Sequence, residues 1–381
     1  MIKKEWDKKI LDCVDGLKSQ FIGSVQELLR IDSVAREACV GAPFGVGVKK
    51  ALDCALDISR QLGFETVNLD HYIGYAQYGV GEDYVCAIGH VDVVLPGEGW
   101  KYPPFSAHLE DDVLYGRGVL DNKGPIMACL YALAAIKEAG LLLKNPIRII
   151  FGCDEESGFE DLHYYLSKEK APLYGFTPDC KYPVVYSERG RAVVRIFGNL
   201  DQLGIFLDFV SQYFLGANNT GDRLGIDFFH EEYGTMEMKG YQLHMLQDSP
   251  DEQKQVAFEV ILSYPGGVSI GEIMEQISRK VEVKGLRAEL LKNFNPVVFS
   301  KDSSMVKAMR ESYELITGLD GSPVTTTGGT YAKAMPGIVP FGPSFPGQKG
   351  ISHNPNEWMS VEDLMTNFKI YALALYRLGQ L

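Results

Sequence analysis

The sequence predicts an α/β protein, in which a sheet is covered by helices and a smaller α+β domain is inserted. Two apolar runs, 84–94 and 146–152, have the character of buried strands, and an amphipathic helical segment at 126–140 separates them. Strand, helix, strand in this order is typical of a sheet covered on both faces. A change after Arg191 to short alternating strands predicts the insert.

The length predicts more than one hydrophobic core. The chain has 381 residues, and single cores stop growing at roughly 250–300 residues. Long amphipathic helices at 303–318 and 360–379 return to the pattern of the first part of the chain. We expect residues 1–190 and 299–381 to form one discontinuous domain, and residues 191–298 to form the smaller one.

Helical periodicity marks the other elements. Apolar residues recur at three- and four-residue steps through 5–31 and 46–62, and Gly63 and Gly140 stand where helices end. In the insert we expect helices near 201–215 and 270–280, and one of the short strands at 224–229.

Net charge and cysteine content limit the partners and the cell compartment that we expect for the chain. The net charge of -13 repels nucleic acid and anionic membranes, so we expect neither as a partner. The seven cysteines are odd in number and contain no CxxC pair, which predicts reduced thiols in the cytoplasm. The N-terminus resembles no signal peptide, and no apolar run is long enough for a membrane span.

Polar side chains interrupt the apolar pattern at the end of the first buried strand. His90 and Asp92 lie two residues apart, so in a strand they face the same side and could share a metal ion. A strand that turns polar as it leaves the core is the alternative. Asp121 lies in a glycine-flanked loop, where it could bridge two cations or cap the helix that begins near Pro125.

Three consecutive acids, Asp154, Glu155 and Glu156, follow the second buried strand. Like charges this close are unfavourable without a cation or solvent. One could bind a metal while its neighbour takes a proton, and a solvated acidic turn is the alternative. Asp179 and His353 complete a set of imidazoles and carboxylates that suits zinc, with manganese or cobalt as alternatives.

Six segments carry a resemblance to a known family: "GHVDVVLPGEGW", "LYGRGVLDNKGP", "DEESG", "TPDCKYPVVYSERG", "TTTGGTYAKAMPG" and "SHNPNEWMSVEDL". In this order they resemble the signature blocks of the co-catalytic zinc peptidases of the aminoacylase and carboxypeptidase-G family, above all the PepV- and Sapep-type bacterial dipeptidases. The resemblance spans nearly the whole chain. It implies a zinc-exopeptidase-like catalytic domain, with a mixed sheet between helices, and an inserted lid domain.

The resemblance also implies two divalent cations, most simply zinc, and their ligands. His90 and Asp179 would bind one ion, and Glu156 and His353 the other. Asp121 would bridge both ions, with a cis peptide bond before Asn122.

The same resemblance implies a reaction and the residues that perform it. Asp92 would orient the imidazole of His90. Glu155 would be the general base that activates a metal-bridging water to cleave the amide bond of dipeptides or similar N-acyl amino acids. The turn of Gly328, Gly329 and Thr330 could offer backbone N–H groups to a substrate carboxylate, although an ordinary tight turn explains it equally well.

The lid departs from the family pattern in two ways. A "GHASAP"-like segment, whose histidine supports the oxyanion in relatives, is absent, so the lid is expected to be reduced. Ser263 replaces the arginine that would grip a substrate carboxylate. The missing donor could come from His230, from His244 or from the partner in a homodimer. The substrate could instead differ, or the chain could be a weakly active or inactive paralogue that binds metal or peptide. We favour the hydrolase.

Overall fold

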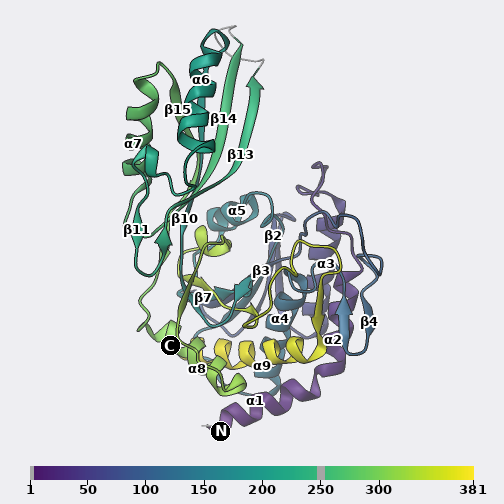
Figure 1. Cartoon of the computed structure of the whole chain (residues 1–381). Coiled ribbons are helices and arrows are strands. Elements are labelled where there is room, and N and C mark those ends of the chain that lie inside the picture. The colour runs from purple at the N-terminus through teal and green to yellow at the C-terminus, as the bar shows by residue number, and fades with distance from the viewer. Residues whose placement is uncertain (1–3, 247–253) are drawn as a thin grey trace. The chain divides into compact units, whose positions relative to one another are not determined.

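The computed structural model describes residues 4–246 and 254–381, which fall into two compact units (Figure 1). The first unit contains the described residues up to Tyr186 together with Phe299–Val324 and Thr330–Leu381. The second contains the described residues of Ser187–Val298 together with Thr325–Gly329. The chain therefore leaves the first unit, builds the second and returns.

A six-stranded mixed sheet forms the centre of the first unit, which confirms the predicted fold class. In spatial order its strands are β1 (Glu65–Leu69), β2 (Ile73–Tyr78), β6 (Ile147–Gly152), β3 (Val85–His90), β7 (Tyr174–Thr177) and β18 (Ile338–Pro340). The four strands from β6 to β18 run parallel, whereas β1 and β2 are antiparallel to their neighbours. Every residue of β3 and β6 is buried, as the apolar runs predicted.

Helices cover both faces of this sheet. The helices of the unit are α1 (Glu5–Gly16), α2 (Lys18–Leu29), α3 (Val46–Gln61), α4 (Lys123–Glu138), α5 (Glu160–Lys168), α8 (Ser304–Thr317) and α9 (Val361–Leu378). Gly74 and Gly89 point to one face, where a Cβ atom would meet Leu56 of α3 and Ile126 of α4. His90 and Gly152 point to the other face, where Asp161 of α5 lies close to Gly152.

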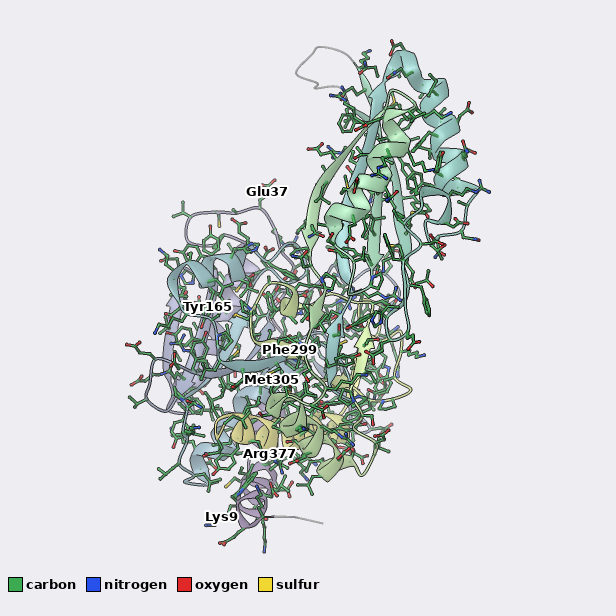
Figure 2. All side chains as sticks on the ribbon, turned by 90° about the vertical axis from the view of Figure 1, so that its left-hand side faces the viewer. Lys9, Glu37, Tyr165, Phe299, Met305 and Arg377 are labelled. Atoms are coloured by element: carbon green, nitrogen blue, oxygen red, sulfur yellow. The ribbon has the colours of Figure 1, made fainter. Side chains whose placement is uncertain are left out.

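The helices hold one another through both apolar and ionic contacts. The segment 5–31 forms two helices that meet at Leu17. Helix α4 packs against α1, α2 and α9, and fourteen of its residues are buried. Arg377 of α9, labelled in Figure 2, donates to Asp7 of α1 at 2.9 Å, so the last helix of the unit is tied to the first.

Short strands complete the framework. They are β4 (His108–Glu110), β5 (Val113–Tyr115), β8 (Cys180–Lys181), β9 (Val185–Glu188), β16 (Val297–Val298), β17 (Val324–Thr326), β19 (Pro343–Ser344) and β20 (Trp358–Ser360). Two of the sheets have the orders β20-β5-β4 and β19-β8, and a third has the order β16-β9-β17, in which β16 pairs with Ser187 and Glu188 of the second unit.

The second unit is a four-stranded antiparallel sheet with helices and its own core. Its strands are β10 (Gly190–Asn199), β13 (Glu237–Leu246), β14 (Gln255–Tyr264) and β15 (Arg287–Phe294), in the order β13-β14-β10-β15. Its longer helices are α6 (Leu203–Val210) and α7 (Ile270–Glu282), near the positions that the sequence predicted. Ala192, Val194 and Ile196 alternate into the core, as expected for a sheet with one covered face.

One predicted strand of the insert is wrong. Residues 224–229 form a turn and an irregular segment, and only Phe229 enters a short strand, β11 (Phe229–His230), paired with β12 (Gly234–Thr235). Leu224 and Ile226 are nevertheless buried in the core. Gly225 has a φ of +76°, which breaks an extended conformation, so alternating apolar residues here mark burial from a loop.

Two further findings bear on the composition. Cys86, Cys129 and Cys153 are buried in the first unit, where a thiol behaves as a small apolar side chain. Among the described residues, no helix is both long and apolar enough to cross a membrane.

Candidate metal centre

The polar residues that interrupt the apolar pattern meet at one edge of the central sheet. His90 is the last residue of β3, Glu155 and Glu156 follow β6, and Asp179 follows β7. These three strands are parallel, so their carboxyl ends lie side by side, where open α/β sheets place their ligand sites. Asp121, just before α4, joins them at this edge.

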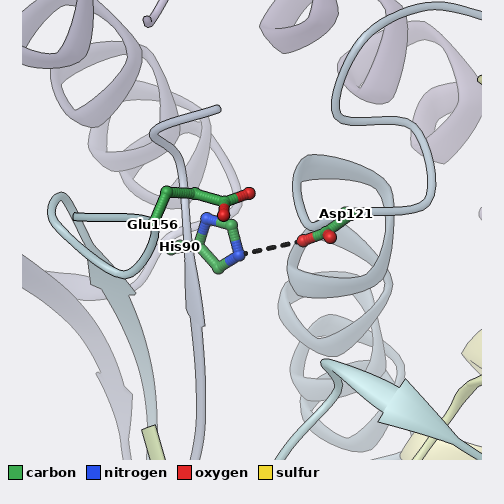
Figure 3. Close-up of side chains that lie close together, drawn as sticks. All are labelled: His90, Asp121 and Glu156. Carbon is green, nitrogen blue, oxygen red and sulfur yellow. Dashed lines mark hydrogen bonds and ion pairs between the residues drawn. The ribbon is translucent and has the colours of Figure 1, made fainter. Parts of the chain in front are cut away.

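Asp121 lies between two imidazoles. Its Oδ1 is 3.1 Å from Nε2 of His90, and its Oδ2 is 3.0 Å from Nε2 of His353. Figure 3 shows the carboxylate of Asp121 facing the ring of His90, with Glu156 beside them. His353 comes from the loop between β19 and β20, and its Nε2 also lies 3.0 Å from Oε1 of Glu156. Segments far apart in the sequence thus converge on one carboxylate.

The donor set fits divalent cations. His90, Asp121 and Glu156 place ligand atoms within 4.8 Å of one another, and so do His90, Glu155 and Asp179. Four carboxylates around two imidazoles leave an excess of negative charge that a cation would neutralise. Imidazole and carboxylate ligands suit zinc, manganese and cobalt. Glu155, expected to act as a base, therefore also lies within reach of a metal ligand group.

Asp92 lies beside the imidazole of His90 and also contacts the acidic turn. Nδ1 of His90 lies 3.0 Å from the main-chain oxygen of Asp92 and 3.4 Å from its carboxylate. The Asp92 carboxylate also accepts hydrogen bonds from the N–H groups of Glu155 and Glu156, at 3.4 and 3.1 Å. It is fully buried. Asp92 therefore joins the imidazole of His90 to the acidic turn.

The side chain of Asn122 supports the centre, a role that the sequence did not predict. Its Nδ2 donates to the carbonyl of Pro178 at 2.6 Å, and its Oδ1 accepts from the N–H of His90 at 3.4 Å. The peptide bond from Asp121 to Asn122 is cis, which confirms that expectation. A Cβ at Gly89 would lie 2.2 Å from Oδ1 of Asn122, so this contact requires glycine in β3.

A buried acid lies beneath the acidic turn. Asp161, in α5, accepts hydrogen bonds from the N–H groups of Cys153 and Asp154, at 2.6 and 3.1 Å, and from the hydroxyl of Tyr331. Burial, together with the carboxylates of Asp92 and Asp154, raises the pKa of Asp161 to about 7. Neither Asp161 nor Tyr331 carried a local sequence signal, because their contact joins positions 170 residues apart.

The charges of the centre shift the pKa values of its members. Burial and the carboxylate of Asp179 raise the pKa of Glu155 well above its ordinary value. Burial and the carboxylate of Asp121 do the same to the pKa of Asp179. Burial lowers the pKa of His90, but its bonds to Asp121 and Asp92 outweigh burial and raise it.

The pKa values of His353 and Asp121 shift in the directions expected for an ion pair. Hydrogen bonds to Asp121 and Glu156 raise the pKa of His353 to about 10. Burial raises the pKa of Asp121, but the two imidazoles outweigh it and hold that pKa below its ordinary value. Asp121 is therefore the carboxylate of the cluster most strongly held in its charged form.

The glycine turn shows an internal contact of its own. The N–H of Gly328 donates to Oγ1 of Thr326 at 3.2 Å, and Oγ1 of Thr330 accepts from the N–H of Ala332 at 3.2 Å. Gly329 is exposed. The structure therefore shows a turn with one N–H engaged locally.

The other candidates of the insert lie within the second unit. Ser263 is buried in β14, opposite Arg191 of β10. His230 packs on Tyr233, with ring centroids 4.5 Å apart, and His244 lies 3.7 Å from the carboxylate of Glu259.

Two imidazoles and four carboxylates therefore meet beside the carboxyl ends of parallel strands, and such a donor set is typical of metal-dependent hydrolases. The sequence profile described as "Peptidase family M20/M25/M40" matches residues 86–377. The chain belongs to this family of metal-dependent peptidases.

Individual relatives agree with this assignment. The chain is 28% identical to "Putative dipeptidase YtjP" of Bacillus subtilis (strain 168), over 95% of this chain and 98% of that protein. It is 27% identical to a "Putative dipeptidase" of Staphylococcus epidermidis, over 98% and 99%. The first alignment spans 453 positions against the 381 residues of this chain, so that relative has segments that this chain lacks.

Solved structures share the fold. Human carnosine dipeptidase 1 superposes with a TM-score of 0.76 at 16% identity, covering 99% of this chain and all 100% of that one. The di-peptidase Dug1p from Saccharomyces cerevisiae superposes with a TM-score of 0.71 at 16% identity, covering 98% of each chain. At such identities the likeness concerns the fold alone.

Proposed function

We propose that the chain hydrolyses the amide bond of dipeptides or similar N-acyl amino acids with two divalent cations. The observation that carries the proposal is the position of Asp121, whose two oxygens lie 3.1 and 3.0 Å from the imidazoles of His90 and His353. A carboxylate so placed can be shared by two ions. The dipeptidase names of the relatives support the substrate class.

Each ion would have its own ligands besides Asp121. His90 and Asp179 would hold one ion, and Glu156 and His353 the other, with zinc as the first choice and manganese or cobalt as alternatives. Bound ions of this kind supply a lowered pKa for water and a polarised amide carbonyl. Asp92 would keep the imidazole of His90 oriented through its nearby oxygens.

Glu155 would act as the general base. It lies in the group formed with His90 and Asp179, and its N–H is held by the carboxylate of Asp92. A carboxylate at this position suits a group that takes a proton from water and returns it to the leaving amine.

We further propose a division of labour between domains. Residues 1–190 and 299–381 would be the catalytic domain and 191–298 a reduced lid, with Gly328, Gly329 and Thr330 receiving a substrate carboxylate. Oxyanion support would come from the insert or from a second copy of the chain in a homodimer. The three buried thiols suit a reducing compartment such as the cytoplasm.

A dipeptide panel with Zn²⁺, Mn²⁺ or Co²⁺ tests the proposal. We expect metal-dependent turnover in the wild type and a loss of about 10²–10⁴-fold in Glu155→Gln, the range typical of general-base catalysis. Metal content should stay unchanged, and Glu160→Gln, an exposed neighbour, should behave as the wild type. Turnover that survives in Glu155→Gln would contradict the assigned base.

A second function, metal or peptide binding without efficient turnover, is favoured by one observation. Ser263 stands in β14 where the resemblance expects an arginine, and a hydroxyl cannot form a bidentate contact with a carboxylate. Full metal occupancy without turnover on any dipeptide would support this alternative over the hydrolase.

A further inference from the structure

The carboxylate of Glu357 is fully buried and points into the loop that precedes α4. Its Oε1 accepts hydrogen bonds from the N–H groups of Leu120 and Asp121, at 2.9 and 3.0 Å. The N–H of Gly118 lies 3.2 and 3.1 Å from its two oxygens, and Nη1 of Arg117 donates to Oε2 at 2.7 Å. One carboxylate therefore satisfies four donors of the segment that ends in Asp121.

The loop is shaped around this carboxylate. Gly118 has a φ of +94°, a conformation that side-chain-bearing residues rarely adopt. A Cβ there would also come within 3.0 Å of Val93 and 3.1 Å of Lys123. Main-chain N–H groups that turn toward one point form a concave site for an anion. Here the anion is a side chain of the protein itself.

Glu357 also fixes its own segment. The N–H of Gly116 donates to the carbonyl of Glu357 at 3.0 Å, directly beyond the antiparallel pair of β5 and β20. Asn356 contacts Lys101 and Gly99, at 2.6 and 3.0 Å. The loop of His353 is thus joined by its last two residues to two other loops.

Arg117 joins the carboxylate of Glu357 to a third segment, at 96–100. It is 1% exposed, and its Nη2 donates to the carbonyl of Pro96 at 3.1 Å. Its guanidinium lies over the ring of Trp100, 5.3 Å from the centroid. The buried pair of Arg117 and Glu357 is therefore anchored on both sides.

His353 lies at the exposed side of the centre, outside regular structure. Its side chain is 52% exposed, its φ is +61°, and its polar contacts are with Asp121 and Glu156. His90, by contrast, is held by the hydrogen bonds of β3 in the sheet.

We propose that Glu357 is a positioning residue that sets the separation of Asp121 and His353, and thereby the affinity for the ion between His353 and Glu156. The inference rests on the proposed function, since it assumes that these side chains bind metal. Disturbing Glu357 should weaken that ion more than the ion held by His90 and Asp179, whose supports lie on β3 and β7.

The test is the binding of Co²⁺ to the metal-free chain. Equilibrium dialysis measures the affinity, and the visible spectrum reports the surroundings of the bound ion. Glu357→Gln keeps the shape but presents an amide to Arg117 and to the N–H groups. We expect the wild type to bind two ions and the variant to bind one of them about 10–100-fold more weakly, as when outer supports of metal ligands are lost. The spectrum of the weaker ion should change, and that of the tighter ion should not.

Glu362→Gln is the matched control, because Glu362 is an exposed glutamate five positions further along the chain. Arg117→Lys, which keeps the charge beside Glu357, covers the case in which Glu357→Gln does not fold; it should weaken the same ion by a smaller factor. Folded variants with wild-type affinities and spectra would overturn the inference alone. A wild-type chain that binds no ion would overturn the proposed function as well.

Discussion

The two imidazoles that face Asp121 are supported in opposite ways. His90 is fully buried at the end of β3, within a sheet, whereas His353 is half exposed on a loop with a left-handed backbone. Nδ1 of His90 lies beside the oxygens of Asp92, whereas the loop of His353 ends at Glu357, whose buried carboxylate accepts from the N–H group of Asp121. The comparison teaches that two equivalent donors need different supports, according to whether regular structure reaches them.

Removing each imidazole gives the largest expected difference. Both His90→Ala and His353→Ala should lower turnover by about 10³-fold or more, since a bound cation supplies several kcal/mol of stabilisation. His90→Ala should destabilise the metal-free chain more, by about 3 kcal/mol, because it empties a fully buried site and removes the imidazole from the buried carboxylate of Asp92.

His353→Ala should lower that free energy of unfolding by a smaller amount, because the half-exposed imidazole pairs with Asp121 and Glu156 where solvent weakens the interaction. Urea unfolding in the presence of a chelator measures both values. Equal losses of unfolding free energy in the two variants would remove the contrast between His90, at the end of a sheet strand, and His353, on a loop.

Asp92→Asn tests the support of His90 by itself. The substitution halves the acceptor capacity that faces His90 and the N–H groups of Glu155 and Glu156. We expect metal affinity to fall about 10–100-fold, with the ion at His90 more affected than the ion at His353. This is the reverse of the order expected for Glu357→Gln. Asp83→Asn, an exposed site before β3, is the control, and Co²⁺ titration is the measurement.

Gly89→Ala tests the close contact behind His90. The added Cβ would lie 2.2 Å from Oδ1 of Asn122 and 3.0 Å from Ile126, so Asn122 must move away from Pro178. We expect a loss of about 1–3 kcal/mol in the free energy of unfolding, as for other overpacked sites. Gly23→Ala in α2, where a Cβ meets nothing within 4 Å, should be neutral or stabilising. A tolerated Gly89→Ala would show that Asn122 can shift without cost.

A further expected effect is a pH dependence that belongs to Asp161, whose carboxyl lies beneath the acidic turn. The pKa of Asp161 is raised to about 7, so between about pH 4 and 7 the folded chain keeps a proton that the unfolded chain releases. The proton on Asp161 contributes fully to the free energy of unfolding below about pH 4. That free energy then falls by up to about 1.4 kcal/mol per pH unit as the pH rises to 7.

Asp161→Asn carries no titrating proton and should remove this slope. Unfolding of both metal-free proteins at pH 5, 6 and 7 gives the comparison. Parallel curves would mean that the carboxyl of Asp161 is already charged at pH 5.

Much of this centre could be predicted because its sequence signals are local. His90 ends an apolar run, the acids at 154–156 end another, and the ordered blocks carry a family resemblance. The structure brings His90, Asp121, Glu156 and His353 together, with Asp179 3.7 Å from His90. Their roles as ligands stay a prediction.

The supports could not be predicted, because each is a single residue whose meaning depends on a distant partner. Glu357 contacts a loop 236 residues away, and nothing in "NPNEW" distinguishes it from a surface acid. The apolar alternation at 224–229 misled for a related reason, since burial from a loop leaves the same pattern as burial from a strand. Apolar periodicity indicates which residues are buried, but tertiary contacts determine whether a strand or a loop carries them.

The long separation between Asp121 and Glu357 has a consequence for the growing polypeptide. Because the partners lie 236 residues apart, the loop before α4 receives its internal anion only after nearly all of the first unit has been synthesised. Until then four donors at 117–121 must be hydrated, and no incomplete chain on the ribosome can present the arrangement that we assign to peptide cleavage. Assembly of the centre thereby reports that both halves of the interrupted unit have found each other.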